Sequence, residues 1–141
     1  MNGLRIFTDG GARGNPGPSA CAFVVYDGSN LIHQQGFYLG ITTNNQAEYQ
    51  GVLKAVEWLN QELGARSQEL VNFYLDSLLV VKQMRGEYKI KDLKLKILHE
   101  KIKLQVSSFK FQVKWNHIPR EQNSLSDTLV NKTLDGEYEN G

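Results

Sequence analysis

Short apolar runs separated by turn residues fill the N-terminal third of the chain. The runs are rich in β-branched and aromatic residues and are bounded by glycine, proline, asparagine and aspartate, which is typical of β-strands. We expect strands at residues 4–8, 20–26 and about 31–39. Because short loops join them, these strands should form an antiparallel meander.

The apolar spacing becomes helical after Asn45, where Val52, Val56 and Leu59 fall on one stripe. We predict a helix over residues 45 to about 63. A neighbouring stripe of small residues lets this helix lie close to whatever it packs against, and it consists of Ala47, Gly51 and Ala55.

The second half of the chain alternates strands and helices. The apolar run VNFYLD predicts a buried strand at 71–76, and the strict alternation of FKFQVKW predicts another at 109–115. Three further helices are expected at 77–84, 92–106 and 124–134. The expected buried positions of the lysine-rich helix at 92–106 are Leu93, Ile97, Leu98 and Ile102.

This order of elements is typical of an α/β domain, in which the later strands join the sheet through right-handed crossovers. We therefore predict a five-stranded mixed sheet, with a three-strand antiparallel meander plus two parallel strands, and helices on both faces. The domain should occupy residues 1–134, and residues 135–141 should form a flexible acidic tail.

With 141 residues, the chain has the size of a single domain with an ordinary core. Cys21 is the single cysteine, which excludes an internal disulfide, and the sequence has no Cys/His cluster with the spacing of a zinc site. No apolar run has the length of a membrane span or a signal peptide. We expect a cytoplasmic protein that is not associated with a membrane.

The net charge of +1 conceals a strong asymmetry along the chain. Residues 82–114 carry ten Lys/Arg against three Asp/Glu, whereas the remainder carries six Lys/Arg against twelve Asp/Glu. The basic segment indicates a surface that faces a polyanion, although a solvated lysine-rich helix face has the same composition. The acidic remainder is compatible with a metal site.

Four carboxylates stand out by their position. Asp9 and Asp76 each follow a predicted strand, and ligands of α/β sheets gather at the carboxyl ends of strands. Glu48 shares the core-facing stripe of its helix, where a carboxylate is costly unless a cation compensates it. Asp127 lies in the first turn of the last predicted helix.

Three of these carboxylates, all except Asp9, could also be present for a local structural reason. Asp76 can cap the helix that follows it, Glu48 can form a capping box with Asn45, and Asp127 can do the same with Ser124. Carboxylates that cluster, however, repel one another, and divalent cations such as Mg²⁺ or Mn²⁺ remove this conflict. The complete set therefore indicates metal-dependent hydrolysis of a phosphodiester.

The segments around these carboxylates are FTDGGARGNPGP, TTNNQAEY, YLDSLLVV and HIPREQNSLSDTLVN. In this order and at this spacing they resemble the type 1 ribonucleases H, which cleave the RNA strand of an RNA–DNA hybrid. The resemblance implies the ribonuclease H-like fold and two Mg²⁺ ions, with Mn²⁺ as a substitute, bound by Asp9, Glu48, Asp76 and Asp127. In the general two-metal scheme, one ion activates the attacking water and the other stabilises the leaving 3′ oxygen, so the products carry 5′-phosphate and 3′-hydroxyl ends.

The resemblance also assigns roles to polar residues. His117 matches a mobile histidine of the family that assists proton transfer or product release, and the alternative is a histidine simply exposed on a loop. Asn15 and Thr43 would form a pocket for a phosphate of the DNA strand. The other substrate-binding candidates are Ser77 and, along the minor groove of the hybrid where 2′-hydroxyls are displayed, Asn44, Asn45 and Gln46. A polar capping loop is the alternative for these last residues.

Larger relatives carry an extra helix and a basic handle where this chain has only residues 84–92. Four basic residues can serve as a smaller grip on phosphates, namely Lys82, Arg85, Lys89 and Lys91. Tyr88 can act as a stacking group, and a solvent-facing tyrosine is the alternative. Short family members can be less strict about the DNA strand, so cleavage of double-stranded RNA stays open.

Two other functions are compatible with these motifs. A hybrid-binding module that does not cut would keep the fold and the basic surface, but the presence of all four carboxylates argues against it. A domain within a reverse transcriptase or similar assembly is the second, and a short chain that starts at Met1 favours an independent enzyme. We expect a monomer.

Overall fold

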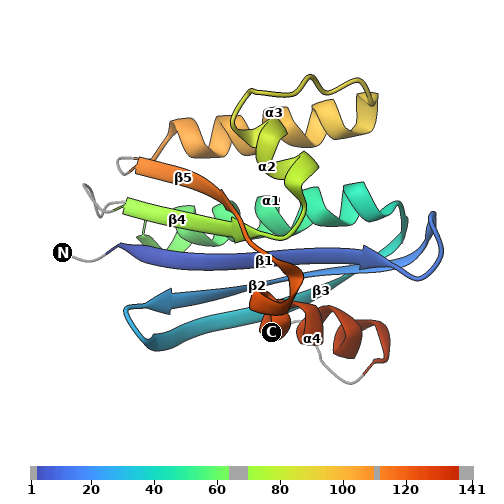
Figure 1. Cartoon of the computed structure of the whole chain (residues 1–141), viewed down its shortest axis with the longest axis horizontal. Helices are drawn as coiled ribbons and strands as arrows, with labels where there is room; N and C mark the ends of the chain where they lie inside the picture. Colours follow the sequence, from blue (N-terminus) through green and yellow to red (C-terminus); the bar gives the residue numbers. More distant parts are fainter. Residues whose placement is uncertain (1–2, 64–69, 110–111, 137–141) are drawn as a thin grey trace.

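The computed structural model describes residues 3–63, 70–109 and 112–136, and its strands form one mixed sheet (Figure 1). The sheet order is β3-β2-β1-β4-β5. The pairs β1–β2 and β2–β3 are antiparallel, whereas β1–β4 and β4–β5 are parallel, which confirms the predicted sheet. The strands are β1 (Leu4–Ala12), β2 (Gly17–Asp27), β3 (Asn30–Thr42), β4 (Leu70–Leu75) and β5 (Gln112–His117).

The first strand is longer than the sequence predicts. β1 continues through two glycines to Ala12, because Gly10 pairs with Cys21 and Ala12 pairs with Ser19 in β2. Glycine is a poor strand former by itself, but pairing with a long neighbouring strand outweighs that preference. Asp9 therefore lies inside β1 and not at its end, which corrects the prediction.

The predicted bounds of the last strand were wrong. β5 begins at Gln112, ends at His117 and pairs with the whole of β4. Phe109 lies before this strand, and residues 110–111 lie outside the described residues. An alternating pattern fixes which residues share a face but not where the pairing starts, since pairing depends on the neighbouring strand. His117, which was expected on a loop, is the last residue of this strand.

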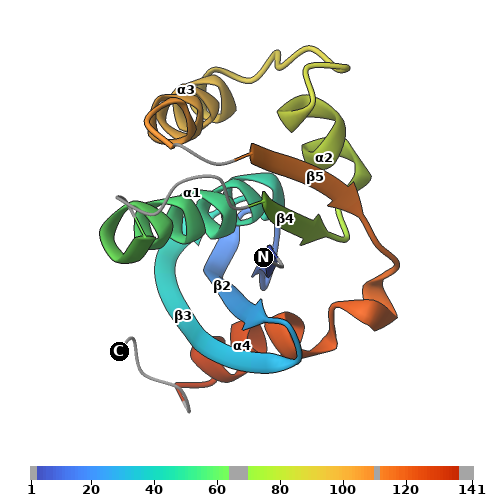
Figure 2. The same ribbon diagram turned by 90° about the vertical axis from the view of Figure 1, so that its left-hand side faces the viewer.

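Helices cover both faces of the sheet, as predicted. Figure 2 shows α1 and α3 on one side of the curved sheet and α4 on the other. Phe23, Tyr49 and Phe73 belong to the larger core, on the side of α1 and α3. The helices are α1 (Asn44–Leu63), α2 (Leu78–Met84), α3 (Leu93–Ser107) and α4 (Ser124–Leu134), with a 3₁₀ turn at Arg120–Gln122. Within the described residues, no helix combines the length and the apolar character that crossing a membrane requires.

The buried face of α3 differs from the prediction. Leu98 and Ile102 are buried together with Leu95, but Leu93 and Ile97 are 71% and 51% exposed. The helix carries apolar residues on two faces, and periodicity alone does not say which face meets the core. Packing against α1 selects the face with Leu95. The opposite face therefore exposes apolar side chains among lysines.

Small residues let α1 lie very close to β1. A Cβ atom added to Gly10 would lie 2.2 Å from the backbone of Ala47, and one added to Gly51 would lie 2.8 Å from the carbonyl oxygen of Asp9. Ala47 and Ala55 are fully buried. The predicted stripe of small residues is thus confirmed, and it brings the N-terminal part of α1 against the middle of the sheet.

Candidate active site

Two aspartates reach the same level of the sheet from neighbouring parallel strands. β1 and β4 pair with Phe7 opposite Tyr74. Two residues further along both chain segments, the same offset places Asp9 level with Asp76, which directly follows β4. Side chains at the same level of adjacent parallel strands point to the same face. The register of the sheet therefore brings these two carboxylates together.

Glu48 joins the two aspartates from α1. The close approach of α1 to β1 places its carboxyl group against that of Asp9, and the two groups share a hydrogen bond. One oxygen from each of Asp9, Glu48 and Asp76 lies within 4.8 Å of the other two. Asp9 is 6% exposed and Glu48 is 8% exposed, so bulk water does little to screen their charges.

Burial changes the protonation of this cluster. Desolvation, followed by the charge of Asp76, raises the pKa of Asp9 to about 7. Desolvation and then the charges of Asp9 and Asp76 raise the pKa of Glu48 well above its usual value. The Oε2 atom of Glu48 is buried and has no hydrogen-bond partner among the described residues. Oxygen ligands that hold protons until a cation replaces them fit a hard divalent metal ion.

A cavity of about 500 Å³ opens at the cluster, and all four carboxylates singled out in the sequence line it. Asp127 enters from the first turn of α4, on the other face of the sheet from α1. It is not among the three residues with the closest oxygens, but its charge also raises the pKa of Asp9. Four acidic residues that are distant in sequence thus meet at one cavity.

The local explanations for the carboxylates do not match the helix caps. Ser77, not Asp76, caps α2, because its Oγ accepts the N–H of Val80 at 3.3 Å. Asp76 instead accepts a hydrogen bond from Asn123. Asn123 occupies the N-cap position of α4 without a capping hydrogen bond from its side chain, and Ser124 is already helical.

The capping box of α1 is formed by Thr43 and Gln46 and does not include Glu48. Thr43 Oγ1 accepts the N–H of Gln46 at 3.2 Å, and Gln46 Oε1 accepts the N–H of Thr43 at 2.9 Å. These two predicted substrate contacts therefore have a structural task in the free protein. The carboxylate of Glu48 is left to the cavity.

The glycine and proline-rich loop after β1 is fastened to the start of α1. Asn15 Oδ1 accepts the N–H of Asn44 at 2.9 Å, and Asn44 Oδ1 accepts the N–H of Ala12 at 2.9 Å. The lining of the cavity includes Asn44, Asn45 and Ser77, whereas Asn15 lies outside it, as do Thr43 and Gln46. These two hydrogen bonds fasten the loop beside the cavity.

His117 is exposed and lies outside the cavity lining. The next residue, Ile118, donates its N–H to the carbonyl of Leu75 at 2.9 Å, which holds the chain after β5 beside the residue that precedes Asp76. The histidine is thus near the edge of the site by its backbone. Its assigned role in proton transfer or product release stays a prediction.

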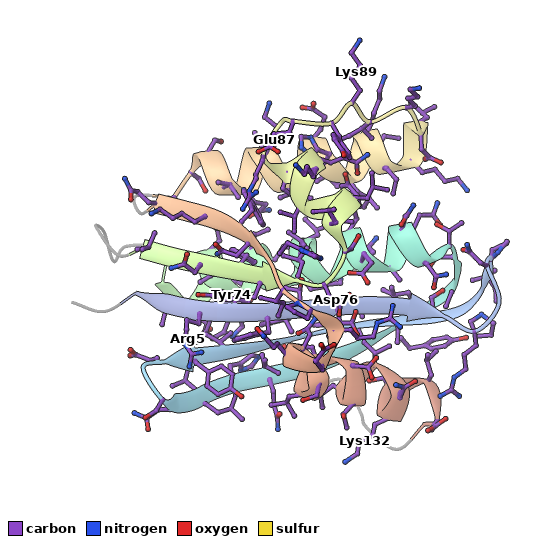
Figure 3. All side chains as sticks on the ribbon, in the orientation of Figure 1. Arg5, Tyr74, Asp76, Glu87, Lys89 and Lys132 are labelled. Carbon is purple, nitrogen blue, oxygen red and sulfur yellow. The ribbon has the colours of Figure 1, made fainter. Side chains whose placement is uncertain are left out.

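The basic segment lies apart from the cavity. Figure 3 shows Lys89 on the link between α2 and α3, pointing away from the body of the molecule and well separated from Asp76. Tyr88 and Lys89 line a second hollow of about 510 Å³ together with His99, while Lys91 is exposed outside that hollow. Lys82 lies over the ring of Tyr88, 5.6 Å from its centroid. A basic and aromatic surface is therefore present here, and its contacts with a substrate stay a prediction.

Three residues at or beside the site were not singled out from the sequence. Arg13 and Arg120 line the cavity, and Arg13 forms an ion pair with Asp135 at 2.6 Å. Asn123 is buried beside Asp76. An arginine in a loop or in a 3₁₀ turn carries no periodic signal, and the asparagine looks like an ordinary cap, so only the tertiary arrangement reveals these residues.

Comparison with known proteins shows to which family the chain belongs. The sequence family described as reverse transcriptase-like matches residues 7–133. The solved structure of LC11-RNase H1 in complex with RNA/DNA hybrid superposes with a TM-score of 0.91 at 40% identity, covering 94% of this chain and 97% of that chain. The chain belongs to the type 1 ribonuclease H family.

Two of the curated relatives that this chain matches are longer proteins. A ribonuclease HI of Halobacterium salinarum is 34% identical over 135 residues, which cover 94% of this chain and 64% of the relative. The RNase H1 structure from that archaeon has a TM-score of 0.86. A bifunctional protein of Mycobacterium tuberculosis is 35% identical over 132 residues. This chain spans about a third of that protein, since the match covers 35% of it.

Proposed function

We propose that the protein is a metal-dependent endoribonuclease that hydrolyses the RNA strand of RNA–DNA hybrids. The observation that carries the proposal is the convergence of oxygens from Asp9, Glu48 and Asp76 within 4.8 Å. Membership of the type 1 ribonuclease H family and the solved hybrid complex of LC11-RNase H1 support the substrate.

The acidic cluster fits divalent metal ions, and we propose Mg²⁺, with Mn²⁺ as a substitute. Hard carboxylate oxygens suit these ions, which usually bind a few carboxylates together with phosphate oxygens of a substrate. A pair of such ions would supply an activated water and neutralise charge on the reacting phosphate. Asp127, which also lines this cavity, is the fourth carboxylate available to them.

The remaining residues of the cavity bind and orient the substrate in this proposal. Arg13 and Arg120 bring positive charge to a cavity otherwise dominated by carboxylates, which favours the approach of a phosphate. Asn44 and Asn45 present amide groups at the same cavity, where they can contact 2′-hydroxyls and base edges in a minor groove. Asn15 and Thr43 are proposed to hold a phosphate of the DNA strand beside it.

We further propose that the protein acts as a monomer in the cytoplasm and uses the lysines of the α2–α3 link to hold the hybrid backbone. Cleavage of double-stranded RNA is an outcome for the test to decide. A hybrid-binding module that does not cut would be the conclusion if binding occurred without hydrolysis.

The test is cleavage of end-labelled RNA in an RNA–DNA hybrid, with RNA duplex and single-stranded RNA as comparison substrates, under Mg²⁺ and Mn²⁺ titration. Asp76→Asn should abolish cleavage while hybrid binding persists, because the substitution removes a metal ligand without adding bulk. Asp27→Asn, at the distal end of β2, is the matched control and should cleave normally. Hybrid binding by the unsubstituted protein with no cleavage under either metal would overturn the proposal.

A further inference from the structure

We propose that Asn123 is a positioning residue that fixes the acidic cluster in the geometry required for binding a divalent cation. The inference rests on the proposed function, since it concerns the cation that the cluster is proposed to hold. Asn123 precedes α4 in the chain and is 2% exposed. Nothing in its local sequence distinguishes it from a helix cap, yet its side chain makes no capping hydrogen bond.

The side-chain amide of Asn123 connects β1 to the residue after β4. Its Nδ2 donates to the carbonyl of Thr8 at 2.8 Å and to Oδ2 of Asp76 at 3.0 Å. Thr8 is the neighbour of Asp9 in β1, so one amide group ties the strand that carries Asp9 to Asp76, directly after β4. The donor to a backbone carbonyl has to be the nitrogen, which fixes the orientation of the amide.

The backbone of Asn123 connects the same point to α4. Its carbonyl accepts the N–H of Asp127 at 3.1 Å, in the first turn of that helix. Ser126 adds a second link to β1, because its Oγ donates to the carbonyl of Phe7 at 3.2 Å. Asn123 thus contacts, directly or through one neighbouring residue, the chain segments that supply Asp9, Asp76 and Asp127.

An amide suits this place better than a charged group. A lysine or arginine would neutralise Asp76 and compete with the cation, whereas a carboxylate would add to the repulsion within the cluster. The N–H donor holds an oxygen of Asp76 and leaves its negative charge available to a metal ion. The Oδ1 of Asn123 is buried with no hydrogen-bond partner among the described residues. The side chain is therefore held by the two hydrogen bonds that its Nδ2 donates.

The chain offers a matched control for this amide. Asn116, in β5, also donates through Nδ2 to two acceptors, Asn72 Oδ1 and the carbonyl of Phe73, both at 3.1 Å. It lies outside the lining of the acidic cavity. Replacing either asparagine by alanine removes two hydrogen bonds, but only one of the two variants disturbs a carboxylate of the cluster.

The experiment measures Mn²⁺ affinity by calorimetry on the protein without nucleic acid, beside stability to urea in the presence of a chelator. Asn123→Ala should bind Mn²⁺ at least about 10-fold more weakly, since loss of an outer partner of a metal ligand typically has an effect of about 10 to 100-fold. Asn116→Ala should bind Mn²⁺ normally while losing comparable stability. Asn123→Ser, which keeps a hydroxyl donor and leaves a smaller void, replaces Asn123→Ala if that variant does not fold.

A double-mutant cycle separates positioning from general destabilisation. In an Asp76→Asn background, Asn123→Ala should cause little further loss of Mn²⁺ affinity, because the partner through which it acts has already changed. Unchanged Mn²⁺ affinity in Asn123→Ala, or an equal loss in Asn116→Ala, would overturn the inference. Failure to cleave hybrid with normal Mn²⁺ binding would count against the proposed function alone, whereas absence of Mn²⁺ binding in the unsubstituted protein would overturn both.

Discussion

The acidic cavity and the lysine-rich surface are assembled in different ways. We define the lysine-rich surface as the lysines around the α2–α3 link, namely Lys82, Lys89, Lys91, Lys94 and Lys96. The carboxylates of the cavity come from β1, α1, the end of β4 and α4, and two of them are buried. The lysines are close together in sequence, and Lys89, Lys91, Lys94 and Lys96 are exposed. The cavity therefore depends on long-range packing, whereas the surface depends on composition. The acidic cavity is therefore suited to chemistry that needs fixed distances between groups. The lysine-rich surface is suited to attracting a polyanion, an interaction that salt screens.

The largest expected effect comes from a carboxylate of the cavity. Glu48→Gln keeps the size of the side chain but removes the charge, and kcat should fall by about 10³-fold, because a bound metal ion supplies several kcal/mol of transition-state stabilisation. The KM for hybrid should change little if the lysine-rich surface provides the affinity. Steady-state kinetics with labelled hybrid measure both values. A normal kcat would remove Glu48 from the site.

The packing that builds the cavity gives the next effect. Gly10→Ala places a Cβ 2.2 Å from the backbone of Ala47, so α1 must move away from β1. We expect a loss of about 3 kcal/mol in the free energy of unfolding, at the upper end for overpacking, and reduced cleavage. Gly11→Ala is the matched control, since its Cβ would meet Val130 Cγ1 at an ordinary 3.8 Å. Equal stability of the two variants in urea would contradict the close packing.

The pH dependence of stability reports the same buried charges. The pKa of Asp9 is raised from 3.8 to about 7 in the folded protein, so folding favours the protonated form. This contribution is fully present below about pH 4 and is lost as the pH rises towards 7, by a few kcal/mol at about 1.4 kcal/mol for each pKa unit. Urea unfolding in a chelator at several pH values measures it. Asp9→Asn should flatten the profile over this range, and an unchanged profile would contradict the assignment.

The smallest effect is expected on the lysine-rich surface. Replacing Lys89, Lys91 and Lys94 by alanine should reduce the slope of log affinity against log salt by about 0.9 for each phosphate that the variant no longer neutralises, with kcat unchanged. Lys132→Ala is the control, because Figure 3 shows Lys132 on α4, at the opposite end of the molecule from Lys89. A slope equal to that of the unsubstituted protein would make these lysines a solvated helix face.

The difference between the two regions also explains what could be predicted from the sequence. The antiparallel meander and the approximate helix positions follow from local patterns, and the small residues of α1 correctly indicated close packing. The bounds of β1 and β5 depended on their partner strands, so they could not be read locally. The exposure of Leu93 and Ile97 depended on which face of α3 meets α1.

The candidate site was predictable as a set of carboxylates but not as a geometry. The four carboxylates lie in recognisable sequence motifs, and the structure brings them to one cavity. They are Asp9, Glu48, Asp76 and Asp127. Arg120 and Asn123 have no comparable signal. They reach the site because the chain from β5 to α4 crosses the end of β4, which is a property of the topology and of no single motif.

Anomalous scattering from crystals of the protein soaked with Mn²⁺ would show directly whether the acidic cluster holds a divalent cation. We predict a peak bound by carboxylate oxygens of Asp9, Glu48 and Asp76, which weakens or disappears in crystals of Asp76→Asn. Crystals with full access to Mn²⁺ that show no peak at these carboxylates, or a peak only at another surface, would contradict a metal-binding role for the cluster.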